Sequence, residues 1–215
     1  MSDQPGSSYR TIEGRAIAEI VEKKSRFIGQ IAHVETEEEA LAFLDEVRAE
    51  HRMARHNVYA YVLRGAGGAP GRVRYSDDGE PARTAGTPTL EAIQHAGLVD
   101  VAVVVTRYFG GILLGTGGLV RAYTQATQAA VEAAHVVTIS RCADVLVEVP
   151  YSLYEKSVRV AEAAGAKVAD ADFGAAVALT LRVLAGHEDE LAHALTEATS
   201  GTAEILAGKP FDAAF

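Results

Sequence analysis

The order of apolar patterns in the last third of the chain constrains the fold most strongly. After residue 136 the pattern restarts, and strand-like runs alternate with helix-like runs in the order β-α-β-β-α-β. The predicted elements are strand 144–149, helix 153–164, strands 167–172 and 175–184, helix 188–198 and strand 202–206. Because this order is the signature of a ferredoxin-like domain, we expect one at residues 141–215.

The rest of the chain predicts a second domain at residues 1–136. Thr36, with Glu39 three residues later, forms a capping box that marks a helix start. The predicted elements are strands 10–20 and 27–34, helix 36–52, strands 57–63 and 73–76, helix 89–96, strand 100–106 and helix 119–134. The glycine-rich stretch 65–71 predicts a flexible loop. We therefore expect an α+β protein of two domains.

Composition limits the classes of function. The net charge of −9 disfavours a general nucleic-acid binder, but residues 50–121 hold eight arginines against six acids, a local balance of +2. The polar start at residues 1–8 is unlike a signal peptide, and no apolar run is long enough for a membrane span. One cysteine, Cys142, supports neither a disulfide nor a thiolate metal cage. We expect a cytoplasmic protein without a membrane partner.

The strongest local signal for function is a buried-type strand that runs into a glycine-rich loop and then a helix. The loop follows Arg107 and Tyr108, and its glycines are Gly110, Gly111, Gly115, Gly117 and Gly118. Glycines let backbone amides approach a ligand closely, and a helix start offers free N–H groups to an anion. Arg107 and Arg121 flank the loop and suit phosphate. The alternative is that the glycines only permit a tight turn.

Two nucleotide-binding motifs are absent from this loop. Val120 stands where the dinucleotide fingerprint needs glycine, and Thr116 follows Gly115 where a P-loop needs lysine. We predict no cofactor.

Three carboxylates in four residues form a second signal, at Asp77, Asp78 and Glu80. Such a group suits Mg²⁺ or an acid–base pair. The alternative is structural, with Asp78 or Glu80 paired to Arg74, Arg83 or Arg107.

A third signal is basic. Lys23, Lys24 and Arg26 lie at a predicted turn, and His51 and His56 flank a predicted helix end. The histidine spacing is a poor match to two ligands on one helical face, so we predict no metal site. We instead expect the two histidines to widen a basic patch formed with Lys23, Lys24 and Arg26.

Four blocks of residues, in this order, resemble the IMPACT/YigZ family. They are residues 23–29, residues 54–61, residues 77–86 and residues 105–123. The sequence departs from the family pattern at Val58, Arg83, Thr87 and Leu113.

The resemblance implies an N-terminal β-α-β fold of the ribosomal-protein type, as in domain four of elongation factor G, and a C-terminal domain like that factor's ferredoxin-like domains. It also implies a link to translation, because the eukaryotic relatives restrain a translational stress kinase. Bacterial members have no firmly established reaction.

Two functions remain open from the sequence. The first is a factor, rather than an enzyme, that binds RNA or the ribosome through the basic glycine-loop face. The second is a Mg²⁺-dependent hydrolase or transferase that acts on a small phosphorylated ligand. The acidic C-terminal domain is a poor RNA platform and favours contact with a protein partner.

Overall fold

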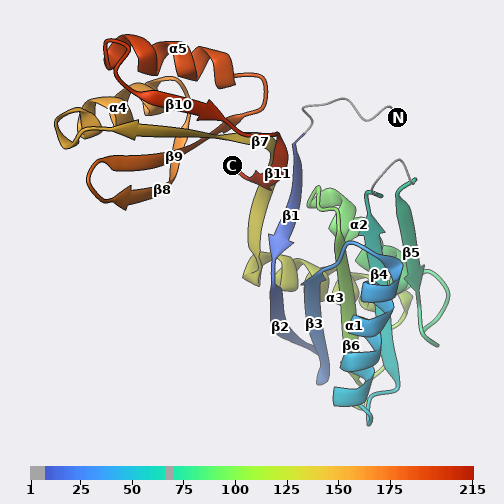
Figure 1. Cartoon of the computed structure of the whole chain (residues 1–215). Coiled ribbons are helices and arrows are strands. Elements are labelled where there is room, and N and C mark those ends of the chain that lie inside the picture. Colours follow the sequence, from blue (N-terminus) through green and yellow to red (C-terminus); the bar gives the residue numbers. More distant parts are fainter. Residues whose placement is uncertain (1–7, 66–69) are drawn as a thin grey trace. The chain divides into compact units, whose positions relative to one another are not determined.

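The computed structural model describes residues 8–65 and 70–215 (Figure 1). The predicted polar start and the predicted glycine-rich loop fall largely outside these ranges. Contacts between Cα atoms divide the described chain into one unit at residues 9–138 and another at residues 139–215. No helix in the described ranges is long and apolar enough to cross a membrane.

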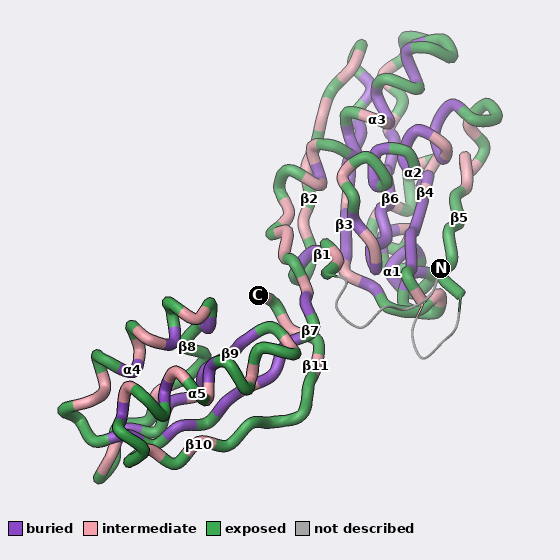
Figure 2. The backbone as a smooth tube through the Cα atoms, turned by 90° about the horizontal axis from the view of Figure 1, so that it is seen from above, coloured by how far each residue is buried: buried purple, intermediate pink, exposed green. Residues whose placement is uncertain are grey.

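The N-terminal domain is built on an antiparallel five-stranded sheet with the order β2-β3-β6-β4-β5. The strands are β2 Arg15–Glu22, β3 Ser25–His33, β4 His56–Leu63, β5 Arg72–Ser76 and β6 Val101–Tyr108. A further strand, β1 Tyr9–Glu13, precedes β2. Gly14 separates the two at a φ of 70°, which is why the predicted single strand 10–20 is divided. Figure 2 shows β6 and β4 largely buried and β5 exposed.

Helices cover both faces of this sheet. The helices are α1 Glu37–Glu50, α2 Gly86–His95 and α3 Thr116–Ala133. Alternate residues of β6 face opposite cores, so that Val104 packs with α1 while Val103 packs with α2 and α3. Thr36 caps α1 as predicted, because its side chain accepts from the Glu39 N–H at 3.1 Å.

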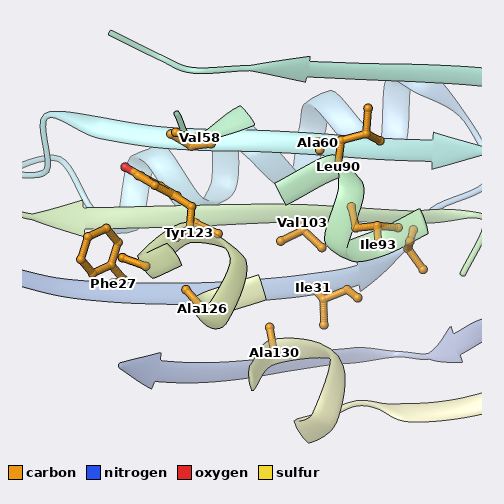
Figure 3. Packing of buried hydrophobic residues seen from close by; sticks show 14 of the residues in the cluster. Phe27, Ile31, Val58, Ala60, Leu90, Ile93, Val103, Tyr123, Ala126 and Ala130 are labelled. Atoms are coloured by element: carbon orange, nitrogen blue, oxygen red, sulfur yellow. The ribbon is translucent and has the colours of Figure 1, made fainter. Parts of the chain in front are cut away.

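Small residues let α3 lie close to the sheet (Figure 3). Ala126 and Ala130 face β3, and a Cβ at Gly29 would collide with the Ala126 carbonyl. In the first half of the helix, the Tyr123 and Phe27 rings meet edge-on, with their centres 5.2 Å apart. The close approach fixes α3, and with it the loop that precedes it.

The C-terminal domain has the predicted β-α-β-β-α-β order. Its elements are β7 His135–Val149, α4 Tyr151–Ala163, β8 Lys167–Phe173, β9 Val177–Leu184, α5 Glu188–Ala198 and β10 Glu204–Ala207. The strands form an antiparallel sheet with the order β10-β7-β9-β8. An additional strand, β11 Phe211–Ala214, pairs with β7. The α+β class and the ferredoxin-like element order are confirmed.

Candidate nucleic-acid interface

The basic and glycine-rich segments meet at one end of the N-terminal sheet. The register pairs Arg26 with Tyr108 and His56 with Arg107, so β3 and β4 begin where β6 ends. The hairpin before β3 and the glycine loop after β6 therefore share this end. α3 starts there as well, at Thr116.

The β2–β3 hairpin presents two lysines. Lys23 and Lys24 have φ values of 46° and 66°, and both side chains are exposed. Two successive left-handed residues are typical of the tight turn that matches the twist of paired strands. Arg26, the next cation, is held by Glu19 through two hydrogen bonds of 2.8 and 2.9 Å.

The glycine loop is fastened to this hairpin. The Gly110 N–H donates to Ser25 Oγ at 3.1 Å, and a Cβ at Gly110 would overlap the backbone of Lys24 and Ser25. Only glycine permits this approach. The hairpin and the loop consequently form one surface.

Arg107 lies inside the domain. Its side chain is 8% exposed, and Nη1 lies 2.6 Å from Glu80 Oε1, whose side chain is 4% exposed. The guanidinium also lies 5.4 Å from the centre of the Phe27 ring and 5.6 Å from that of Phe109. The charge of Arg107 is therefore neutralised within the fold and is not presented to solvent.

Glu80 joins three parts of the domain. Besides Arg107, its Oε1 accepts a hydrogen bond from Tyr123 Oη at 2.9 Å. Burial, together with the neighbouring Glu80 charge, raises the pKa of the Tyr123 phenol far above its usual range. Tyr123 stays a neutral donor, and its hydrogen bond ties α3 to the acidic loop, which we define as residues 77–80.

Asp77 organises the start of α2. Its Oδ1 accepts from the N–H groups of Ala85 and Gly86 at 3.0 and 2.8 Å, and Oδ2 accepts from the Arg83 N–H at 2.8 Å. Arg83 has a φ of 62°, so the segment between Asp77 and α2 holds a residue other than glycine in the left-handed region.

Asp78 also has partners within the fold. Its Oδ1 accepts from Arg48 Nη2 at 3.0 Å, and Oδ2 accepts from the Asn57 N–H at 2.7 Å. His56 Nδ1 lies 2.8 Å from the Asp78 carbonyl and donates to it. Among the described residues, no group of three or more His, Cys, Asp or Glu is arranged to hold a metal ion.

Sequence reasoning missed a polar cluster beside β6. Tyr108 Oη lies 3.0 Å from His51 Nδ1, and His51 Nε2 lies 3.1 Å from Gln30 Nε2. The residues are far apart in sequence, and no local pattern links them.

Sequence reasoning also missed the apolar character of the glycine loop. Phe109 is 55% exposed and Leu113 is 83% exposed, with Ile112 between them. The helix that follows has no side-chain cap at Gly115, and Gly111 and Gly115 have φ values of 84° and 70°.

The two glycines in the first turn of α3 differ. Gly117 is exposed, whereas a Cβ at Gly118 would crowd the Leu114 side chain at 2.9 Å. Arg121, in the second turn, is exposed and makes no ion pair within the described ranges. Four predicted cations thus lie on the surface of this domain: Lys23, Lys24, Arg26 and Arg121.

Two family models match the chain. The model described as Impact N-terminal domain matches residues 23–131, and a domain of unknown function, DUF1949, matches residues 147–202. The Escherichia coli protein IMPACT family member YigZ is 36% identical over 86% of this chain and 90% of its own length.

Solved structures give similar results. A crystal structure of a hypothetical protein matches 94% of this chain and 98% of its own, with a TM-score of 0.59 and 34% identity. The translational regulator Yih1 is 32% identical over 62% of this chain and 51% of its own, with a TM-score of 0.41.

Proposed function

Because the chain belongs to the IMPACT family, we propose that it is a translation-associated factor that binds RNA or the ribosome through one end of its N-terminal domain. We call this end the basic edge and define it by Lys23, Lys24, Arg26, Arg121 and the glycine loop 109–115. The observation that carries the proposal is the joining of the lysine hairpin to the glycine loop through Gly110.

The chemistry of the basic edge suits a nucleic-acid backbone. Lys23, Lys24 and Arg121 are exposed cations, and phosphate contacts by such groups supply most non-specific affinity. Phe109 offers an exposed ring on which a base can stack. Arg107 plays a positioning part, because its pair with Glu80 sets the position of the loops.

Family membership supports the link to translation. Yih1 is a translational regulator, and a Saccharomyces cerevisiae protein IMPACT homolog is 34% identical over 53% of this chain. The Mg²⁺-dependent enzyme draws no support from the contacts, since Asp77, Asp78 and Glu80 all bind groups of the protein itself.

Sucrose-gradient sedimentation of lysate tests the proposal. The native chain is compared at low and high salt with Lys24→Glu/Arg121→Glu and with a control, Arg159→Glu/Lys209→Glu. Both variants change the formal charge equally, and the control residues are exposed on the C-terminal domain. We expect the native chain and the control to migrate with ribosomal particles at low salt only, and the first variant to stay at the top. Native protein that stays at the top at low salt, or a control that is lost equally, would refute the proposal.

A further inference from the structure

Within residues 8–65 and 70–215, one face of the C-terminal sheet has no helix packed against it. α4 and α5 both pack on the other side, where they cover Val145, Val147 and Leu179 (Figure 1). Since a sheet normally buries both faces or leaves a polar one to water, the composition of the open face is informative.

The open face carries acids and exposed leucines. The register places Glu204 beside Glu148, and Leu206 beside Leu146. The same pairing continues across the sheet. Ala178 of β9 lies between Glu148 and Asp172 of β8, and Thr180 lies between Leu146 and Asp170. We define the acidic sheet face by these residues: Leu146, Glu148, Asp170, Asp172, Glu204 and Leu206.

The basic residues of this side are already occupied. Arg182 binds both carboxylate oxygens of Asp144, at 2.8 and 3.0 Å, and lies 4.9 Å from the Phe211 ring. Lys167 lies 4.6 Å from the ring of Phe215. Phe211 and Phe215 thus pack against the two basic side chains, Arg182 and Lys167. Within the described ranges, none of the four acids of the acidic sheet face makes an ion pair.

Two features of this face are unfavourable for the chain alone. Like charges directly opposite each other on neighbouring strands destabilise a sheet, and Glu148 and Glu204 are such a pair. Leu146 is 48% exposed and Leu206 is 67% exposed, side by side. A partner that brings positive charge and an apolar stripe would remove both penalties.

We propose that the acidic sheet face docks a basic amphipathic helix of a partner protein, with its leucine-type stripe over Leu146 and Leu206 and its lysines or arginines toward the acids. The dimensions agree: four strands about 4.8 Å apart span about 14 Å, the length of about ten helical residues. Charge complementarity selects a basic protein segment and disfavours nucleic acid.

The test uses the full chain and two labelled 15-residue peptides. One repeats lysine and leucine with leucines at helical i, i+3 and i+4 spacing, and the other has glutamate in place of lysine. We expect the lysine peptide to bind in fluorescence anisotropy and the glutamate peptide not to bind. Equal binding of both peptides would overturn the proposal.

Variants locate the site. In Glu148→Lys/Glu204→Lys the dissociation constant for the lysine peptide should rise at least about tenfold, as expected for loss of charge complementarity at a docking surface. The control, Glu155→Lys/Glu162→Lys on α4, makes the same charge change at exposed positions. It should change the dissociation constant by less than about threefold, because only the general effect of net charge remains. Leu146→Ala/Leu206→Ala keeps the charge and should still weaken binding. An equal effect of the α4 control, or no effect of the leucine variant, would reduce the result to general attraction and overturn the proposal.

Unfolding and self-association could also change the binding of the peptide, and each has its own measurement. Melting temperatures establish that each variant is folded. Sedimentation velocity asks whether the native chain dimerises, since a dimer lost in Glu148→Lys/Glu204→Lys would assign the face to a second copy and contradict the proposal. Amide exchange with the lysine peptide bound should slow at β7 and β10 and not at α4.

Discussion

Arg107 and Glu80 form an ion pair that is almost fully removed from water, with Nη1 2.6 Å from Oε1 and with Tyr123 donating to the same oxygen. The pair joins the end of β6, the acidic loop and α3. Burying the two charges carries a desolvation penalty. Removing one partner is nevertheless unfavourable, because it leaves the other charge buried and unpaired.

Removing Glu80 should therefore be strongly destabilising. We expect Glu80→Ala to lower the free energy of unfolding by about 3–5 kcal/mol, because Arg107 stays buried and unpaired. Urea unfolding of the full chain measures this. Glu19→Ala breaks the exposed pair with Arg26 and should have little effect, since solvent screens it. Similar losses in both variants would contradict the assigned role of burial.

Asp77 is expected to matter for stability and not for metal binding. Asp77→Ala leaves the N–H groups of Arg83, Ala85 and Gly86 without their acceptor and should cost about 2 kcal/mol. Amide exchange at Ala85 and Gly86 should speed up. Glu91→Ala, on the exposed side of α2, serves as the control. A melting temperature of the native chain that rises with Mg²⁺, and does not in Asp77→Ala, would restore the metal-binding interpretation.

Two glycines of the loop region should respond oppositely to alanine. Gly110→Ala places a methyl group against the backbone of Lys24 and Ser25, which should cost about 1–3 kcal/mol or more and weaken ribosome binding. Gly117→Ala, in an open helical position, should be neutral or stabilise by up to about 1 kcal/mol. Thermal unfolding of both variants checks this; a harmless Gly110→Ala would show that the hairpin and the loop are not fastened together.

The acid sensitivity of the N-terminal domain should depend on Glu37. The hydrogen bond from Tyr61 Oη, with Arg72 and Arg74 nearby, lowers the pKa of this carboxyl below its usual 4.5. A lowered pKa contributes stability above the usual value, and the contribution is lost as the pH falls through the folded-state pKa. The difference in stability between the native chain and Glu37→Gln should thus be largest near neutral pH and shrink in acid. Glu38→Gln, exposed beside it, should run parallel to the native chain.

The like-charge pair on the acidic sheet face predicts a stabilising substitution. Glu204→Lys places opposite charges across from Glu148 and should raise the stability of the C-terminal domain by about 0.2–1 kcal/mol. The same change should weaken binding of the lysine peptide. A variant that is less stable, though still folded, would show that the repulsion between Glu148 and Glu204 is already screened.

The elements with strong periodicity were predictable from the sequence, and the burial of charge was not. Helix α1 and its cap at Thr36 are local, because the capping bond joins residues three apart. The partner of Arg107 was one of several arginine–acid pairings left open, since Glu80 lies 27 residues away. Strand β11 was missed because its four residues pair with a distant part of β7 and carry little apolar pattern of their own.

The close approach of Gly110 to the Lys24–Ser25 backbone has a consequence for the rate of the proposed binding at the basic edge. A loop that is free in solution must be ordered on binding, and that ordering reduces affinity and slows docking. Here the glycine loop is already fixed to the hairpin. For the binding proposed above, the basic edge would be a preformed template, and we expect long-range attraction between charges, and not rearrangement of the loop, to set the rate of association.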